Sequence, residues 1–471
     1  MIIKNKIKGN GYYNEFTLST EEPLSKKTWF SSIFLSLALI SLSSVPATKT
    51  YASGVNMEGL GIRAMSMGSA FIGLADDASA VFWNPAGLSQ LKGAGYTFGV
   101  YSMTADVDAK NGVSNNSLPG GDYDPNKGDL FPGFYPSEPT NFDDDEELWL
   151  GAATMPSFLI FKNFGRYTLA GGAFGVGGAY SSYNDKIFDP ANDAEIEADV
   201  FAVLGLMSIN GSIGYQVTQK LSVGFGVDML INVWRGDVKK DYISASGSDW
   251  NYNYDAKIRK WGYGFQGNIG VLYKFNEQWS VGAIYRTGSD IKLEGDTKIR
   301  LKGGSNIDPF KTNEKSDGHT DFEYGASWGV GVAYKPTKKL TFTYDYREND
   351  WSDFNWPGSN ATFDEPGKFL QNVDGDPGWN RAHGYSVGTE YLLNNKITLR
   401  AGYTNESSGV PSEFENPATI TLGDIQIANV GMGFQYDTWK VDVLVGTMWG
   451  GTGYGVDHRC YDFGISFMRM L

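Results

Sequence analysis

The chain has 471 residues, and its 39 Lys and Arg residues against 54 Asp and Glu residues give a formal charge of −15. Sixty glycines and an aromatic content of 14% exclude a disordered chain, and the glycines lack the three-residue period of collagen. The acidic balance, without a basic cluster, argues against a nucleic-acid partner. A single cysteine, Cys460, and the separated His319, His383 and His458 argue against a disulfide framework and a metal site, and we expect no cofactor.

One long apolar run is present near the N-terminus, from Trp29 to Val45, and it follows two lysines. The basic start, the apolar middle and the small residues that end at Ala52 are the three parts of a secretory signal peptide. We therefore expect residues 1–52 to be a signal peptide, cleaved after Ala52 or alternatively after Ala47. An uncleaved N-terminal membrane anchor is the competing interpretation. No later segment has the ~18 uninterrupted apolar residues that a spanning helix needs.

Residues 53–91 do not show strand periodicity. Small and apolar residues in the first half recur at intervals of three and four, as on a short helix, and Asp76 or Asp77 can cap a second short helix. Pro85 ends that second helix and keeps Asn84 out of the helical conformation. The segment is therefore predicted to be a compact helical plug, which we call the hatch.

Residues 92–471 alternate between apolar and polar side chains, most regularly from Leu221 to Trp234. Strands that begin at Trp279, Ile397 and Trp439 repeat the pattern, with glycine and charge on the second face. Membrane strands need ~9 to 11 residues with an apolar outer face, whereas strands of soluble sandwiches have ~5 to 6. The pattern predicts an all-β membrane protein, a transmembrane β-barrel.

Very short polar connections alternate with long polar segments along this region. The short ones lie around 163–165, 218–220, 276–278, 337–339, 394–396 and 437–438, and the long ones at 105–147, 179–198, 239–256, 288–320, 349–381, 405–423 and 449–458. With a first strand at Gly95–Met103 and a last at Tyr461–Met470, the count is 14 antiparallel strands. An even count places both ends on one side, and short turns are usually periplasmic, so we expect both termini in the periplasm.

Two groups of side chains on these strands are interpreted by position. Aromatic residues at strand ends are predicted to form belts at the membrane interfaces, with core packing as the alternative: Trp234, Trp261, Trp279, Trp439 and Tyr461.

Charged residues facing the lumen are Asp228, Arg286, Asp345, Arg347, Glu390, Arg400, Lys440 and Asp442. They are interpreted as a salt-bridged network that holds the hatch rather than as a catalytic set, and we expect no catalytic residues and no enzyme activity.

The run from Ala75 to Leu88, with Asn84, Pro85 and Ala86, resembles the N-terminal hatch of FadL-type outer-membrane transporters for long-chain fatty acids and other hydrophobic compounds. The resemblance implies a barrel closed by the hatch, with these three residues in a signature turn. It also implies a hydrophobic pocket near the mature N-terminus, for which the apolar candidates are Val55 and Met57.

The resemblance further suggests a lateral opening at a kink in the third strand, Tyr167–Tyr180. Candidate residues for this opening are Gly171, Gly172, Gly175, Gly177 and Gly178. Glycine weakens a strand and often marks a bulge. The alternative is that these glycines only make room for the hatch.

The function implied by the resemblance is passive, ligand-gated uptake of a hydrophobic molecule such as a long-chain fatty acid, with lateral release through the barrel wall. A PorV-like secretion accessory barrel that binds protein partners is the alternative, and an outer-membrane hydrolase is a third possibility. The acidic residues 143–147 are interpreted as a solvated loop that binds divalent cations together with lipopolysaccharide. Expected partners are thus the hydrophobic ligand, outer-membrane lipid and lipopolysaccharide, around a monomer in the bacterial outer membrane.

Overall fold

The computed structural model describes residues 59–109, 147–189, 194–244, 251–304, 309–352, 360–374, 379–407, 409, 424–451 and 456–471. All of them belong to one compact unit, Ala47–Leu471. The predicted signal peptide, residues 143–146 of the acidic segment, and Val55 and Met57 lie outside the described residues. In the described part of the chain, no helix combines the length and the apolar character needed to cross a membrane.

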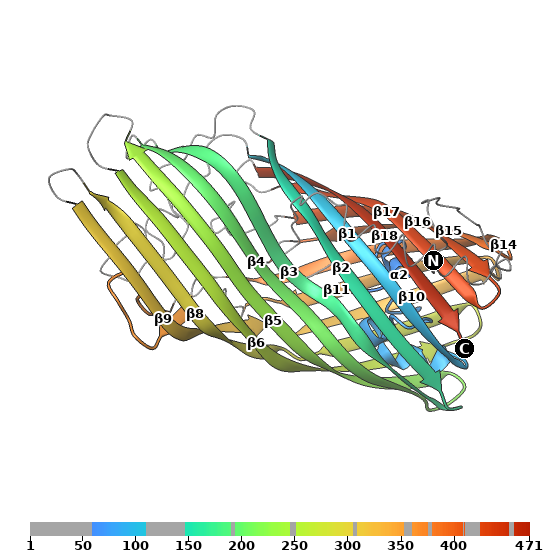
Figure 1. Cartoon of the computed structure of the whole chain (residues 1–471). Helices are drawn as coiled ribbons and strands as arrows, with labels where there is room; N and C mark the ends of the chain where they lie inside the picture. The colour runs from blue at the N-terminus through green and yellow to red at the C-terminus, as the bar shows by residue number, and fades with distance from the viewer. Residues whose placement is uncertain are drawn as a thin grey trace, which may run out of the picture. The chain divides into compact units, whose positions relative to one another are not determined.

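The strands form one antiparallel sheet that closes on itself, because β1 pairs with both β2 and β18 (Figure 1). The strands are β1 (Ala94–Ala109), β2 (Glu147–Asn163), β3 (Tyr167–Asp189), β4 (Ala194–Gln216), β5 (Leu221–Ser244), β6 (Asn251–Lys274), β7 (Trp279–Arg286), β8 (Ser289–Gly304), β9 (Pro309–Tyr324), β10 (Ser327–Thr337), β11 (Leu340–Asp350), β12 (Asn360–Phe363), β13 (Val373–Asp374), β14 (Arg381–Asn394), β15 (Ile397–Glu406), β16 (Asp424–Tyr436), β17 (Trp439–Gly451) and β18 (Val456–Met470).

Two pairs of consecutive strands make single spans: β7 continues as β8, and β9 continues as β10. The short strands β12 and β13 lie between β11 and β14 and add no span. The barrel therefore has 14 antiparallel strands, which confirms the fold predicted from the alternating connections.

The outward face of the barrel is apolar and exposed, as the two-residue period predicts. Phe225 and Phe265 expose 51% and 60% of their surface, and many outward neighbours expose similar fractions. A soluble domain does not leave so large an apolar band uncovered, whereas a membrane barrel presents such a band to lipid.

Among the predicted belt residues, Trp261, Trp279 and Tyr461 are exposed on this outward face. The prediction for Trp234 is wrong. Its neighbour Val233 faces outward, so Trp234 points into the barrel, where it packs against the main hydrophobic core.

Several strands are longer than predicted, because the loops expected at 179–198, 239–256 and 288–320 consist mostly of strand. Apolar side chains continue along these extensions and meet the segment after β11 in a second core. Its buried members are Val238, Tyr254, Ala256, Ile299, Leu301, Ala361, Phe363 and Leu370. Burial of this core offsets the entropy lost in ordering polar segments that composition alone predicts to be loops.

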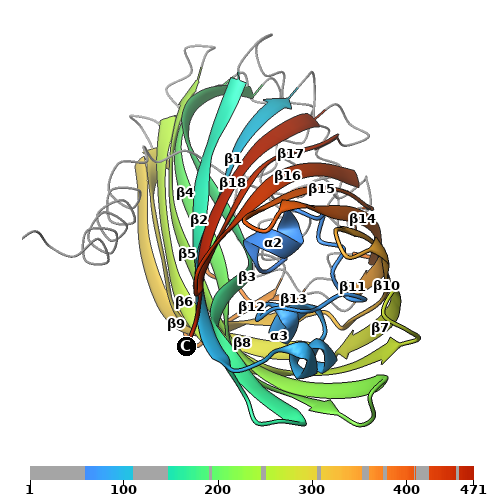
Figure 2. The same cartoon turned by 90° about the vertical axis from the view of Figure 1, so that its right-hand side faces the viewer.

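The described part of the hatch, residues 59–91, lies inside the ring of strands (Figure 2). It contains α2 (Ile62–Met65), α3 (Ala80–Trp83) and the 3₁₀ helix η1 (Pro85–Gln90). The first helix has only one turn, because Gly68 and Ser69 adopt positive φ and reverse the chain. As predicted, the second helix ends before Pro85, and Asn84 is extended with φ −170°.

The hatch backbone runs around the inner wall of the barrel in direct contact with glycines of the strands. A Cβ on Gly402 would collide with the backbone of Met67 and Gly68, and a Cβ on Gly224 would collide with that of Pro85 and Ala86. Barrel glycines that meet hatch backbone in this way also include Gly214, Gly282, Gly331 and Gly388, and Gly270, Gly431 and Gly464 meet hatch side chains as closely. Luminal glycine therefore lets the two backbones approach closely, and we call this set the glycine seat.

Polar side chains of the barrel form hydrogen bonds with backbone N–H and carbonyl groups of the hatch. Asp345 Oδ2 accepts the N–H groups of Phe71 at 2.5 Å and of Ile72 at 2.7 Å. Asn429 Nδ2 donates to the carbonyl of Met65 at 3.0 Å. Buried backbone groups outside regular structure need such partners, so these bonds specify where the hatch rests.

A cluster of charges joins the hatch to β14 and its neighbours. Arg63 of the hatch contacts Asp76 at 2.5 Å and Glu390 at 2.8 Å, and Arg400 contacts the same Glu390 at 2.7 Å and Asp442 at 2.7 Å. Burial disfavours the charge on Asp76, but Arg63 and Lys335 outweigh that effect and hold the pKa of Asp76 below its usual range. Part of the lumen network predicted from the sequence therefore anchors the hatch.

The glycine seat predicts that Gly402→Val raises the conductance of the purified mature chain in planar bilayers. Overpacking of this kind costs about 1–3 kcal/mol, which multiplies the unseated fraction of hatches roughly 5- to 150-fold. Gly211→Val is the matched control, because nothing lies within 4 Å of a Cβ at Gly211. Equal conductance of the two variants would contradict a tightly seated hatch.

The ion cluster predicts an acid-induced leak. Because the folded-state pKa of Asp76 is depressed, its stabilising effect is complete above the ordinary carboxyl pKa and is lost as pH falls through the folded value. We expect constant conductance from neutral pH down to about pH 4 and a rise below it. Asp76→Asn should leak already at neutral pH, and a variant as tight as the natural chain at every pH would show that this pair does not hold the hatch.

Candidate functional site

A cavity lies directly above the hatch, between its aromatic residues and the strands on the opposite wall. Its apolar lining includes Ile72, Val81, Phe82, Trp83, Val176, Ile284, Trp328 and Trp351. Polar residues that share the lining include Asp228, Arg286, Tyr324, Arg347 and Glu406. A concave apolar surface with a few convergent polar groups is the usual form of a site for a small molecule.

Two arginines of this cavity lie over hatch rings. The guanidinium of Arg286 is 4.2 Å from the ring centre of Phe82, and that of Arg347 is 5.5 Å from the ring centre of Trp83. Among the described residues neither arginine forms an ion pair, and Arg347 Nε is buried without a hydrogen-bond partner. Both arginines therefore keep donors for an acceptor inside the cavity.

The nearby carboxylate of Asp228 is already occupied by neutral donors. Ser208 and Asn210 donate to its Oδ1 at 2.6 and 2.9 Å, and Asn268 donates to its Oδ2 at 2.8 Å. These three bonds occupy most of the acceptor positions of Asp228, so it has little remaining capacity to accept hydrogen bonds from the two arginines, although it keeps its negative charge.

The predicted signature turn lies below this cavity and ties the hatch to the wall. Asn84 is fully buried, and its Nδ2 donates to the carbonyls of Ile72 at 3.1 Å and of Val271 on β6 at 3.0 Å. Its Oδ1 accepts the N–H of Ala86 at 3.1 Å, while Pro85 starts η1. One side chain thus connects two hatch segments and a barrel strand.

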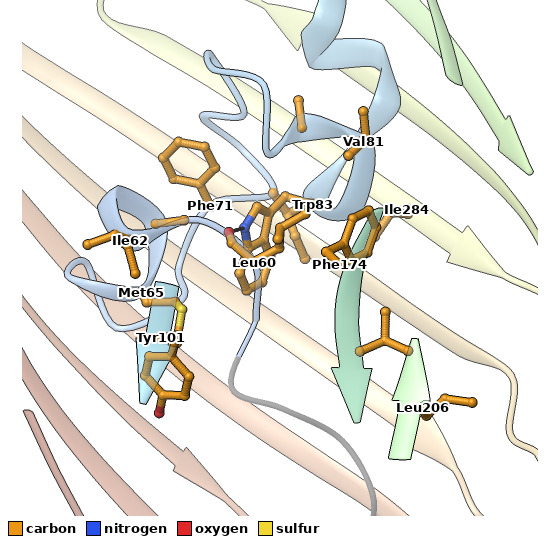
Figure 3. Packing of buried hydrophobic residues seen from close by; sticks show 14 of the residues in the cluster. Leu60, Ile62, Met65, Phe71, Val81, Trp83, Tyr101, Phe174, Leu206 and Ile284 are labelled. Carbon is orange, nitrogen blue, oxygen red and sulfur yellow. Dashed lines mark hydrogen bonds between the residues drawn. The ribbon is translucent and has the colours of Figure 1, made fainter. Parts of the chain in front are cut away.

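Trp83 connects the cavity to the start of the described hatch. Its indole Nε1 donates to the carbonyl of Leu60 at 2.7 Å, and its ring packs edge to face against Phe71 (Figure 3). The Trp83 ring also packs edge to face against Phe82. Phe82 in turn contacts Phe174 of β3, with ring centres 6.3 Å apart. A displacement of the cavity floor would therefore move the segment around Leu60.

The ladder between β2 and β3 ends halfway along both strands. Pairing runs from Asn163–Thr168 to Ser157–Phe174 and, within the described residues, does not continue beyond. Pro156, the next residue of β2, has no N–H to donate, and β3 has an irregular register between Gly175 and Gly177. The outer halves of β2 and β3 instead pair with β1 and β4, which leaves an unpaired edge between them.

A hollow at this edge brings the two regions together. It is lined by Gly59, Leu60, Gly61, Ile62 and Met65 of the hatch, Tyr101 of β1, Met155, Pro156 and Ser157 of β2, and Gly175 of β3. The candidates Val55 and Met57 precede this hatch segment in the chain but lie outside the described residues.

Three of the other predicted glycines of β3 have strand backbones as their nearest neighbours. A Cβ on Gly171 would meet the carbonyl of Asn210, one on Gly172 that of Phe158, and one on Gly178 that of Leu204. None of these three neighbours belongs to the hatch. At these three positions glycine therefore makes room for a neighbouring strand and not for the hatch.

Sequence reasoning placed Arg286 and Arg347 in a paired lumen network and did not single out Pro156. Alternation shows which charges face the lumen, but it does not show which of them find partners. The residue type of Pro156 was the available signal, since proline is rare inside a sheet unless a ladder bond is missing. In the described part of the chain, no group of three or more His, Cys, Asp or Glu residues is placed to hold a metal ion.

Comparisons with known proteins agree with this arrangement. A family model described as "Outer membrane protein transport protein (OMPP1/FadL/TodX)" matches residues 38–454. Outer membrane protein P1 of Haemophilus influenzae is 24% identical, over 87% of this chain and 87% of that protein. The long-chain fatty acid transport protein of Escherichia coli O6:H1 is 22% identical, over 83% of this chain and 84% of that protein.

Among solved structures, the toluene transporter TodX of Pseudomonas putida superposes with a TM-score of 0.63 at 17% identity, over 89% of this chain and all of that one. This likeness shows the shared barrel fold. Because the family model matches most of the sequence, the chain belongs to the OMPP1/FadL/TodX family of outer-membrane transport proteins.

Proposed function

We propose that this chain mediates passive, ligand-gated uptake of long-chain fatty acids or closely similar amphipathic acids across the outer membrane. The observation that carries the proposal is the apolar cavity above the hatch with its two arginines outside any described ion pair. The cavity volume is about 50 Å³, so in this closed state the cavity would take only the acidic end of the ligand, whose carboxylate would accept from Arg286 and Arg347. The hatch would move to admit the alkyl chain beside rings such as Phe82 and Trp83. Charge-assisted hydrogen bonds of this kind are stronger than neutral ones.

The two arginines also favour an acid over a neutral aromatic hydrocarbon as the substrate. One similar structure is a toluene transporter, and one similar sequence is a long-chain fatty acid transport protein, so relatives of both kinds exist. A neutral ring would leave the buried donor of Arg347 without a partner, which is unfavourable.

Release through the unpaired edge between β2 and β3 completes the proposed path. A hydrophobic ligand that passed into water would lose about 0.8 kcal/mol for each CH₂ group that becomes hydrated. Exit at Gly175 and Pro156 would lead instead directly into lipid. The link from Trp83 to Leu60 supports a gate in which ligand in the cavity moves the hatch segment beside this edge.

The proposed membrane arrangement places the short turns and both termini in the periplasm, where short turns of such barrels usually lie. Residues 1–52 would be the signal peptide, 53–91 the hatch and 92–471 the barrel. No cofactor or catalytic group takes part, because facilitated diffusion down a gradient requires no bond to be broken.

The direct test is uptake of a labelled long-chain fatty acid by bacterial cells with and without the chain. We expect faster uptake in cells that contain it. Uptake that is the same in both would overturn the proposal and would favour a barrel of the PorV-like accessory type, which binds protein partners.

The acid-binding role predicts that Arg286→Gln together with Arg347→Gln weakens fatty-acid binding to the purified chain by roughly ten-fold or more. Binding of the corresponding methyl ester, which carries no charge, should change little. Arg381→Gln is the control for loss of a positive charge, because Arg381 is exposed and already paired with Asp350. Equal weakening for acid and ester would mean that the arginines shape the cavity and do not recognise the carboxylate.

The lateral path predicts that large residues at the bulge block uptake but not binding. Gly175→Leu with Gly177→Leu should stop uptake of the labelled fatty acid in cells while its affinity for the purified chain stays nearly unchanged. Gly205→Leu on the adjacent strand is the matched control, since a Cβ there meets nothing within 4 Å. Normal uptake by the double variant would remove the lateral path, and parallel loss of binding would indicate that these glycines pack against the hatch.

A further inference from the structure

The end of the barrel that carries the short turns has an unusual charge. Exposed basic residues stand in four of its six short turns: Arg166, Lys220, Lys338, Lys339 and Lys396. Two more, Lys162 and Arg469, stand at the ends of β2 and β18 beside the turns. The exposed acidic side chains at this end are Glu277 and Asp437 in the remaining two turns. A chain with a formal charge of −15 thus carries a positive collar at one end.

The collar is not neutralised by the protein itself. Within the described residues, none of its seven basic side chains forms an ion pair, whereas basic residues of the outer strands, such as Lys239 with Asp199 and Arg259 with Asp237, do. The charges of the collar are therefore available to an external anion.

Contacts with aromatic rings fix the level of the collar relative to the membrane. Lys162 Nζ lies 5.3 Å from the ring centre of Phe164, which stacks on Tyr167 at 5.2 Å. Arg469 lies 5.0 Å from the ring centre of Trp439. Such rings occupy the interface between hydrocarbon and headgroups, so these two cations stand at the level of the headgroup phosphates.

We propose that this collar binds anionic phospholipids of the inner leaflet, such as phosphatidylglycerol and cardiolipin, in preference to zwitterionic phosphatidylethanolamine. All these lipids have a phosphate, but only the anionic ones keep a net negative charge that the collar can neutralise. Lys162 and Arg469 share the outward faces of β2 and β18 with the exposed Ile160 and Phe463, which favours a lipid over a soluble acidic protein. The selectivity does not depend on which ligand passes through the barrel.

The test uses the mature full-length chain refolded in nanodiscs of phosphatidylethanolamine and phosphatidylglycerol, with native mass spectrometry of the lipids it retains. The natural chain should retain phosphatidylglycerol well above its share of the bilayer. Replacing Lys162, Arg166, Lys396 and Arg469 by Gln should reduce that preference by roughly five-fold for each charge removed. The matched control replaces four exposed lysines far from the collar, Lys239, Lys302, Lys311 and Lys368, by Gln.

Two further measurements on the natural chain keep the proposal testable if the four-fold variant does not fold. The preference should fall as sodium chloride is raised, because exposed charges are screened within a Debye length. Sodium phosphate at equal ionic strength should compete no better than chloride, since a free phosphate has no acyl chains to anchor it.

A salt-independent preference, equal loss in the two Gln variants, or displacement by free phosphate alone would overturn the proposal. In nanodiscs that also contain lipid A, stronger retention of lipid A through the same four residues would overturn it as well, because the collar would then face the outer leaflet.

Discussion

The close contact between the hatch backbone and the glycine seat is the constraint on which the rest of the structure depends. Nine strands carry a seat glycine at a position where a side chain would collide with the hatch. The same contact therefore accounts for part of the high glycine content and for the closing of the lumen by the hatch. On β3, by contrast, Gly171, Gly172 and Gly178 meet other strands, and the hatch contacts this strand through side chains, as where Phe82 packs against Phe174.

The luminal charges divide into two groups with different tasks. Arg63, Glu390, Arg400 and Asp442 satisfy one another and hold the hatch, and a buried pair that loses one partner is strongly destabilised. Arg286 and Arg347 stand on strands of the same barrel without such partners and face the cavity. In the proposed function, stability and recognition would thus use the same residue type, and the position of the carboxylates would decide which task each arginine has.

Much of the fold could be predicted because the physical signals are local. The alternation from Leu221 to Trp234, the short polar turns and Pro85 after Trp83 each fix a structure within a few residues. The extensions of the strands into the expected loops could not be predicted, because these segments are mostly polar. Their apolar positions, such as Val238 and Ile299, are buried only by a segment distant in sequence. The pairing of Arg63 with Glu390 and the end of the β2–β3 ladder at Pro156 also depend on register between distant strands, which one sequence does not specify.

The long outer strands determine how high the entrance stands. β5 has 24 residues, which at about 3.3 Å each gives a length of about 80 Å and, at a tilt of about 45°, a height of about 55 Å. The apolar band of such barrels is about 25 Å tall, so roughly half of the wall rises beyond the hydrocarbon. The second core packs that part of the wall together. In the orientation proposed above, with the short turns in the periplasm, the mouth would open among the sugars of lipopolysaccharide. In that orientation a hydrophobic ligand would enter the protein well beyond the apolar band, before it meets the charged surface of the membrane.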